Sequence, residues 1–239
     1  MSVVTLFPFP GGGGGATDPY FDDVLLLIGA NGTDGSTSFT DESSYARLLT
    51  TVGNAQVDIA QSKFDGGSLL LDGSGDYVSA PYSTDWRIQA NTPFTMEAWV
   101  RFADTSGGKA ILGIADASAI NFTWLFYVSG ANELRFWYYT STTLTSVAGP
   151  FTRSADQWYH LAVDRDASNV LRVYVDGVVV GSATNGNQSN NQINRVLRVG
   201  SAEEHTFDLN GHLDEVRITQ NVARYGGAFT PPTERFPRS

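Results

Sequence analysis

Residues 156–177, DQWYHLAVDRDASNVLRVYVDG, decide the fold of this 239-residue chain. Two runs rich in large apolar residues, 158–163 and 170–175, are joined by the polar residues 166–169, and an Asp-Gly pair follows at 176–177. The glycine of an Asp-Gly pair readily takes the positive φ that a two-residue hairpin turn requires. The stretch therefore predicts two antiparallel strands followed by a second tight turn, and it indicates a sheet protein.

The rest of the chain repeats short apolar runs separated by Gly, Asn, Asp, Ser and Pro. No window of helical length carries a sustained 3.6-residue apolar period, which argues against long helices. We expect further strands at 24–28, 66–71, 77–80, 94–102, 110–114, 124–128, 134–140, 178–182, 195–199 and 213–219. This pattern predicts an all-β fold, a two-sheet antiparallel jelly-roll sandwich.

Composition excludes several classes of partner. The net charge is −10, with 25 acidic and 15 basic residues, and the basic residues are scattered, which argues against binding to nucleic acid. No apolar run approaches the length of a membrane span, and the first residues lack the basic region of a secretory signal peptide. The chain has no cysteine, so its folding does not require an oxidising compartment. We therefore expect a protein that folds in a cytoplasm without disulfides.

The N-terminal residues differ from the rest of the chain. Five consecutive glycines at 11–15 predict a flexible joint, because such a run has no side chain to bury. We expect residues 1–17 to form an extended anchoring arm and residues 18–239 to form the globular domain. Phe7 and Phe9 alternate with prolines, so the arm could dock on a neighbouring molecule as an extended segment, or it could be a frayed terminus.

Four stretches together resemble the laminin-G-like family of concanavalin A-like jelly rolls. They are SKFDGGSLLLDGSGDYV (62–78), FTMEAWVRF (94–102), the hairpin quoted above and GHLDEVRITQNVARY (211–225), and the resemblance covers roughly residues 18–237. More narrowly, DPYFDDVLLL (18–27), NGTDGSTSFTDES (31–43) and FTPPTERFP (229–237) resemble copies of this module in tailed-bacteriophage virion proteins. The resemblance implies that strands 24–28 and 213–219 lie side by side. The chain ends would then meet, with the arm and the Pro-rich tail free to reach a neighbour.

The acidic residues give little support for catalysis. Glycosidases that resemble this fold carry three acidic side chains on one strand, all pointing into a cleft, and no such triad is present. Asp214 and Glu215 are adjacent, so on a regular strand they face opposite sides and cannot act on one bond. Asp164 and Asp166 bracket a turn, where solvated carboxylates are common. The three histidines are far apart in sequence, and no cysteine completes a zinc site. We therefore expect no enzymatic activity.

Calcium is the cofactor that the sequence allows. The loop 31–35 offers the amide of Asn31, the carboxylate of Asp34 and free carbonyls at short spacing, and calcium prefers such oxygen ligands. The resemblance implies that Asp214 could approach Asp34 and complete the site. Asn31-Gly32 and Asp34-Gly35 could equally be two turns without a metal.

A sugar-binding surface is predicted from aromatic residues on two neighbouring strands. Trp124, Arg135, Trp137 and Tyr139 could present ring faces and a guanidinium group to a saccharide. Alternate positions on the second strand would then face the core: Leu134, Phe136 and Tyr138. An aromatic stripe of this kind could also belong to the interior or to a subunit interface.

These observations favour a bacteriophage virion protein that acts by presenting a surface. The resemblance places such a module on the tail, a tail fibre or the capsid surface as a decoration protein, in contact with other virion proteins or host-surface glycans. It also implies a homo-oligomer, a trimer where the module follows fibre symmetry. The alternative is a free carbohydrate-binding lectin, and a glycosidase is less favoured.

Overall fold

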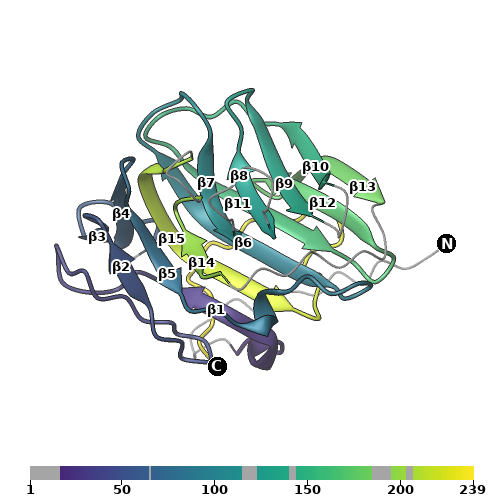
Figure 1. Ribbon diagram of the computed structural model, residues 1–239, viewed down its shortest axis with the longest axis horizontal. Coiled ribbons are helices and arrows are strands. Elements are labelled where there is room, and N and C mark those ends of the chain that lie inside the picture. The colour runs from purple at the N-terminus through teal and green to yellow at the C-terminus, as the bar shows by residue number, and fades with distance from the viewer. Residues whose placement is uncertain (1–16, 65, 115–122, 140–143, 185–194, 203–206) are drawn as a thin grey trace.

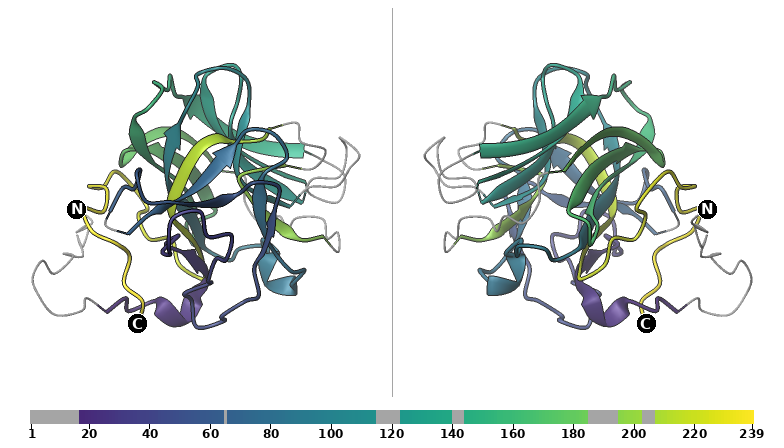
Figure 2. Two further views of the ribbon diagram at one scale, coloured as in Figure 1. Left: turned by 90° about the vertical axis from the view of Figure 1, so that its left-hand side faces the viewer. Right: turned by 90° about the vertical axis from the view of Figure 1, so that its right-hand side faces the viewer.

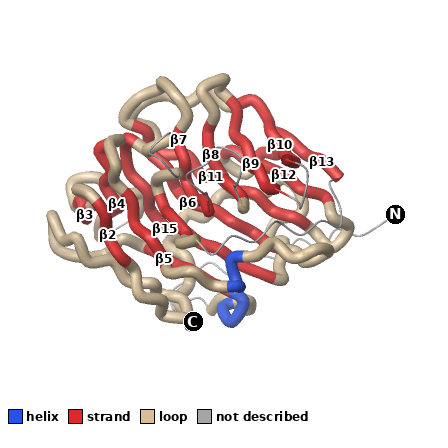
Figure 3. Tube along the Cα trace, in the orientation of Figure 1, coloured by secondary structure: helices blue, strands red, loops and turns tan. Residues whose placement is uncertain are grey.

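The computed structural model consists of two antiparallel sheets packed face to face, with two short 3-10 helices, η1 (Phe21–Asp23) and η2 (Thr84–Trp86) (Figures 1 and 3). The structure describes residues 17–64, 66–114, 123–139, 144–184, 195–202 and 207–239. No helix among these residues is long and apolar enough to cross a membrane. The predicted all-β, two-sheet architecture is confirmed.

Each sheet draws its strands from distant parts of the chain. The eight-stranded sheet has the order β13 (Val178–Thr184), β12 (Val170–Val175), β11 (Trp158–Arg165), β6 (Phe94–Phe102), β15 (Asn210–Gln220), β4 (Ser68–Asp72) and β3 (Gln56–Asp58), with β1 (Val24–Ile28) also paired to β15. The seven-stranded sheet has the order β10 (Leu144–Pro150), β9 (Glu133–Tyr139), β8 (Trp124–Val128), β7 (Lys109–Ile114), β14 (Leu197–Val199), β5 (Tyr77–Ala80) and β2 (Thr50–Val52).

The hairpin that decides the fold is present as predicted. Strands β11 and β12 pair antiparallel, and Asp166 closes their turn by accepting hydrogen bonds from the backbone N–H groups of Ser168 (2.8 Å) and Val170 (3.1 Å). At the next turn Asp176 and Gly177 both have positive φ, of 48° and 80°, which matches the right-handed twist of the flanking strands. The polar residues between the apolar runs therefore fix the register of three consecutive strands.

The sequence did not predict β2, β3 and β10. Strands β2 and β3 have three residues each, too few to show an alternating pattern, and β10 reads LTSVAGP, with Gly and Pro at its end. β10 nevertheless pairs with β9 over seven residues, from Leu144 opposite Tyr139 to Pro150 opposite Glu133. Pairing with a strongly apolar neighbour, and not its own propensity, makes this segment a strand.

The core lies between the sheets and follows the predicted alternation. On β6 the side chains of Phe94, Met96, Ala98 and Val100 are buried in one cluster. The rings of Phe94 and Phe136, from opposite sheets, lie 5.6 Å apart. Burial of one such large side chain contributes roughly 1.5–3 kcal/mol to the free energy of folding. This interface is therefore the main source of stability in the sandwich.

A β-bulge in β15 resets which side chains face the core. Asp214 pairs with Trp99 and Arg217 pairs with Glu97, so Glu215 and Val216 together lie opposite one residue of β6. Glu215 has a φ of 50°, a conformation that costs energy for a residue with a Cβ. Val216 then faces the core, whereas Glu215 and Arg217 do not, since Val216 belongs to the main core cluster and they do not.

Asp214, directly before the bulge, is buried with half of its hydrogen-bonding capacity unused. Its Oδ2 accepts from the backbone N–H groups of Lys63 (3.0 Å) and Phe64 (3.3 Å), while its buried Oδ1 has no hydrogen-bond partner. Burial and the neighbouring charge of Glu215 raise the pKa of the Asp214 carboxyl to about 7. This carboxyl therefore changes its ionisation state near neutral pH.

The two ends of the described chain meet beside β1. The backbone N–H of Asp18 donates to the carbonyl of Ser239 at 2.7 Å, and Figure 2 shows the C-terminal segment ending beside η1. Phe236 is buried against Val24 and Leu27. The expectation that the ends meet is confirmed, but the expectation of a free Pro-rich tail is wrong, because this segment packs against β1 and the eight-stranded sheet.

A buried charge cluster lies beneath the tail. Arg217 donates to Glu97 (Nη2 to Oε1, 2.7 Å) and to Asp18 (Nη1 to Oδ2, 3.3 Å), and Arg224 donates to Asp18 (Nη2 to Oδ2, 2.6 Å). All four side chains are buried. Burial alone would raise the pKa of the Glu97 carboxyl, but the charge of Arg217 and the hydrogen bond from His160 hold it well below its usual range. The Glu97 carboxyl is therefore ionised in its buried pair with Arg217.

We predict that Arg217→Ala destabilises the fold strongly. Removal of one partner leaves Glu97 charged and buried, which typically costs about 3–5 kcal/mol. For a chain of this size that loss lowers Tm by roughly 6–20 °C, measurable by calorimetry. Arg101→Ala is the matched control, because its partner Asp156 is largely exposed and such a pair contributes at most about 1 kcal/mol. Equal effects of the two substitutions would contradict the assignment.

We also predict that Asp214→Asn stabilises the protein in a pH-dependent manner. Because the carboxyl has a higher pKa in the folded than in the unfolded state, its contribution to stability is complete below about pH 4 and is lost as the pH rises to about 7. Asparagine cannot ionise, and its carbonyl can accept the same two N–H groups. Thermal unfolding should show the variant gaining roughly 2–8 °C on the wild type between pH 5 and pH 8. A difference that does not change with pH would refute this.

Candidate functional site

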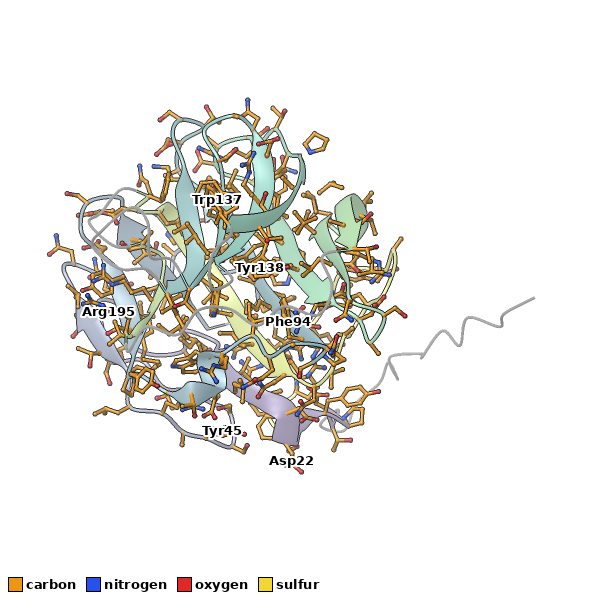
Figure 4. The ribbon with its side chains drawn as sticks, turned by 45° about the vertical axis from the view of Figure 1, so that its right-hand side comes forward. Asp22, Tyr45, Phe94, Trp137, Tyr138 and Arg195 are labelled. Atoms are coloured by element: carbon orange, nitrogen blue, oxygen red, sulfur yellow. The ribbon has the colours of Figure 1, made fainter. Side chains whose placement is uncertain are left out.

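Aromatic side chains gather around one arginine on the outer face of the seven-stranded sheet. Because Leu134, Phe136 and Tyr138 face the core, the alternate residues Arg135 and Trp137 point outward. Figure 4 shows Tyr138 in the interior near Phe94, and Trp137 nearer the edge of the molecule. Side chains on this face are therefore held by a strand whose opposite face is fixed in the core.

The pairing of β8 with β9 brings a second aromatic residue to this face. Tyr127 lies opposite Arg135 in the register, and its ring centroid is 4.8 Å from that of Trp137. Phe207, from the segment before β15, lies 5.3 Å from Tyr127. We refer to Tyr127, Arg135, Trp137 and Phe207 as the aromatic patch. Trp137, Phe207 and Arg135 are partly exposed, whereas Tyr127 is buried beneath them.

Electrostatics fix the arginine within the patch. The Arg135 guanidinium lies 5.5 Å from the centroid of the Trp137 ring and forms an ion pair with Glu133, two residues earlier on the same face. Burial raises the pKa of the Tyr127 hydroxyl far above its usual range, against the opposing charge of Arg135. The patch thus combines the neutral phenol of Tyr127, the partly exposed indole of Trp137 and the guanidinium of Arg135, whose charge is balanced by Glu133. Such a surface can stack on a sugar ring and donate hydrogen bonds to its hydroxyl groups.

Two of the four predicted sugar-binding residues lie in the patch. Arg135 and Trp137 are on one face, as the alternation predicts. Trp124 is not on this face: the register places it opposite Tyr138, and it is fully buried in the core, where its Nε1 donates to the carbonyl of Trp86 at 2.8 Å. Its inclusion in the site was wrong, because a one-residue difference in strand register exchanges the two faces. The side chain of Tyr139 lies outside the described residues.

Sequence reasoning missed two members of the patch. Tyr127 shares the parity of Leu125 on β8, so a correct register between β8 and β9 would have found it. Phe207 has no local signal, because only the folded chain brings it beside Tyr127. The arm residues Phe7 and Phe9 lie outside the described residues.

The three residues predicted to bind calcium make hydrogen bonds to different parts of the chain. Asn31 contacts Glu42 (3.2 Å) and Arg235, Asp34 accepts from the backbone N–H of Ile59 (3.2 Å), and Asp214 accepts from two other backbone N–H groups. Within the described ranges no group of three or more His, Asp or Glu side chains is arranged to hold a metal ion. Each of the three residues is engaged in contacts within the chain, and calcium binding by Asn31, Asp34 and Asp214 stays a prediction.

The buried acidic side chains beneath the tail are engaged in protein contacts. Asp164 accepts from the Tyr174 hydroxyl (2.9 Å) and the backbone N–H of Gly226 (2.7 Å). Glu215 accepts from the backbone N–H of Phe236 (2.7 Å) and from two tail arginines. Their arrangement serves to hold the tail on the sheet and gives no pair of open carboxylates around a common space.

Structures of binding domains and of one sugar-bound enzyme domain share this fold. The binding domain of Paraclostridial Mosquitocidal Protein 1 has a TM-score of 0.66 and 14% identity, covering 86% of this chain and 51% of its own. The ligand binding domain of botulinum neurotoxin serotype D in complex with N-acetylneuraminic acid has a TM-score of 0.61 and 12% identity, with coverage of 88% and 49%. The chain therefore spans about half the length of these toxin domains.

A third structure matches over nearly its whole length. Domain 4 of AbnA, an extracellular GH43 arabinanase from Geobacillus stearothermophilus in complex with arabinotriose, has a TM-score of 0.58 and 18% identity, covering 87% of this chain and 95% of its own. At these identities the likeness shows a shared fold alone. A comparison with curated protein sequences finds no match.

Membership of a family rests on the sequence itself. The Laminin_G_3 profile matches residues 72–224, which include the deciding hairpin, the central strand β6 and the bulged strand β15. This match covers more than half of the chain and agrees with the two-sheet topology. The chain therefore belongs to the Concanavalin A-like lectin/glucanases superfamily.

Proposed function

We propose that this chain is a non-enzymatic module of a tailed-bacteriophage particle and that its aromatic patch binds glycans on the host surface. The observation that carries the binding role is the patch itself. It places a partly exposed indole, a second partly exposed ring and a fixed guanidinium on one face of a rigid sheet. A preorganised surface of this chemistry suits a neutral or weakly charged saccharide.

The fold neighbours support a saccharide as the ligand. The neurotoxin D domain is in complex with N-acetylneuraminic acid, and the arabinanase domain is in complex with arabinotriose. Neither complex identifies the sugar that this chain would bind, because sequence identity is below 20% in both. They support the use of this sandwich as a sugar-binding scaffold.

The phage assignment is supported by the two terminal motifs. The segment 18–27 and the segment 229–237 carry the narrower resemblance to virion proteins, and they lie together in the fold. Asp18 binds Arg224 and Ser239, while Phe236 packs on Val24 and Leu27. Motifs far apart in sequence therefore form one joint. A free lectin remains the second candidate, favoured by the same patch.

The non-enzymatic assignment is supported by the state of the acidic groups. Glu97, Asp164, Asp214 and Glu215 are each at most 1% exposed. A glycosidase needs an acid and a second carboxylate on either side of one accessible bond. Each of the four carboxylates accepts hydrogen bonds from arginines or backbone N–H groups, and these contacts stabilise the fold.

We predict that Trp137→Ala and Arg135→Ala each weaken glycan binding about tenfold or more without lowering Tm by more than a few degrees. Loss of one stacked ring or one charged donor typically removes about 1.5–3 kcal/mol of binding free energy. A glycan array that includes sialylated and arabinose-containing sugars identifies a ligand, and calorimetry then measures Kd. Trp158→Ala, a partly exposed tryptophan on the eight-stranded sheet, is the matched control and should retain wild-type affinity. Equal losses in all three variants would contradict the patch assignment.

We predict that mass spectrometry of purified particles of the encoding phage detects this chain in a fixed ratio to the tail or capsid proteins. Light scattering of the purified protein should give a homo-oligomer, with a trimer expected for a fibre component. Glycan binding without incorporation into particles would favour the free lectin. Presence of the chain in particles without binding to any glycan on the array would support a structural role and contradict the glycan-binding role.

A further inference from the structure

The Phe207 ring of the aromatic patch lies directly over a glycine of the loop between β6 and β7. A Cβ built on Gly108 would lie 2.3 Å from Cδ1 and 2.6 Å from Cε1 of that ring, closer than real Cβ atoms approach a neighbour. The backbone N–H of Ala110 on β7 donates to the carbonyl of Phe207 at 2.7 Å. A side chain at position 108 would therefore displace the Phe207 ring while its backbone stays bound to β7.

A buried arginine holds the loop that carries this glycine. Arg153 is 3% exposed. Its guanidinium donates to three loop carbonyls, those of Asp104 (3.3 Å), Ser106 (2.6 Å) and Gly107 (2.8 Å). A Cβ built on Gly107 would meet no atom within 4 Å, so the surface next to Gly108 is open. The seat of the ring is therefore fixed by the fold, and space for a ligand lies beside it.

Trp137 and Phe207 flank Tyr127 from opposite sides. In the seven-stranded sheet β8, which carries Tyr127, lies between β9, which carries Trp137, and β7, to which Phe207 is bound. The Tyr127 ring centroid lies 4.8 Å from that of Trp137 and 5.3 Å from that of Phe207. Tyr127 is 2% exposed, so a ligand meets the two outer rings, which are partly exposed. Because a whole ring separates them, a single sugar ring cannot stack on both.

The charges of the patch favour a neutral ligand. The Arg135 guanidinium forms an ion pair with Glu133 and lies 5.5 Å from the Trp137 ring centroid. The pair leaves the patch without net charge, on a chain whose net charge is −10. The field of such a chain repels polyanions. A sugar hydroxyl, by contrast, can accept a hydrogen bond from the guanidinium while its ring stacks on the neighbouring indole.

We propose that the aromatic patch selects linear neutral oligosaccharides, with one sugar residue stacked on Trp137 and another on Phe207, and that Gly108 sets this preference by seating the Phe207 ring. This inference rests on the proposed glycan-binding function and adds the ligand class to it. A monosaccharide makes one stacking contact, whereas a chain that spans Tyr127 makes two. A trisaccharide should therefore bind about tenfold more tightly than the monosaccharide of the same sugar.

Titration calorimetry of the full chain tests the length preference. The probes are glucose to cellotetraose, arabinose to arabinotetraose, and the shortened forms of any other neutral glycan that the array identifies. The wild-type Kd should fall by the stated factor between the monosaccharide and the trisaccharide. Phe207→Ala and Gly108→Ala should abolish this difference and leave the affinity for the monosaccharide unchanged, because Trp137 and Arg135 remain. Phe207→Tyr, which keeps a ring, should preserve the difference.

Two control variants separate the seat of the ring from a general effect of substitution. Phe64→Ala removes a partly exposed ring that packs on Trp99 of the other sheet, and Gly227→Ala adds a Cβ that would meet no atom within 4 Å. Both should keep the wild-type length preference, and the Tm of every variant shows whether it is folded. If Phe207→Ala does not fold, Gly108→Ala and Phe207→Leu are measured in the same way.

Three results would overturn the inference and leave glycan binding in place. They are equal wild-type affinity for the monosaccharide and the trisaccharide, an unchanged length preference in a folded variant without the Phe207 ring, and binding of acidic glycans alone. Absence of binding to any glycan would instead contradict the proposed function, and this inference with it.

Discussion

The buried ion pair between Arg217 and Glu97 requires further polar contacts, and residues near both ends of the chain supply them. Arg217 lies on β15 and Glu97 on β6, and both point away from the core of the sandwich. A buried charge is tolerated only with a partner and with its remaining hydrogen-bonding groups satisfied. Asp18 and Arg224 supply those contacts from opposite ends of the chain, and two carboxylates then balance two guanidinium groups. The outer face of this sheet must therefore be covered, and the tail covers it.

The two outer faces of the sandwich consequently differ in how far the chain itself covers them. On the eight-stranded sheet the tail aromatics Tyr225 and Phe229 stack with a centroid separation of 3.4 Å, and the Phe229 ring lies 5.5 Å from that of His160. These polar and aromatic groups make contacts within the protein. On the seven-stranded sheet Trp137 and Phe207 remain partly exposed. The contacts that stabilise the outer face of the eight-stranded sheet are thus separated from the aromatic patch by the thickness of the core, so residues of the patch can change without loss of the fold.

The sequence predicts those features that depend on local alternation. Phe94, Met96, Ala98 and Val100 alternate with polar or outward residues, and the inward face of β6 followed directly. The prediction that Trp124 lies on the sugar-binding surface was wrong because alternation along one strand does not say which face is inward. The pairing of β8 with β9 decides that. The bulge at Glu215 was not predicted, for another reason. A glutamate at a φ of 50° carries no sequence signal, since glycine or asparagine normally marks such a position.

The tail shows the same limit over a longer range. FTPPTERFP has the composition of a loop, and nothing within it predicts that Phe236 is buried or that its arginines meet Glu42 and Glu215. Those contacts join residues about 20 to 200 positions apart, so their partners are known only once the sheet exists. A cation tethered to the chain also differs from a free ion in physical terms. Its effective concentration is set by the tail and not by the solution, so these ion pairs do not depend on the concentration of a dissolved partner.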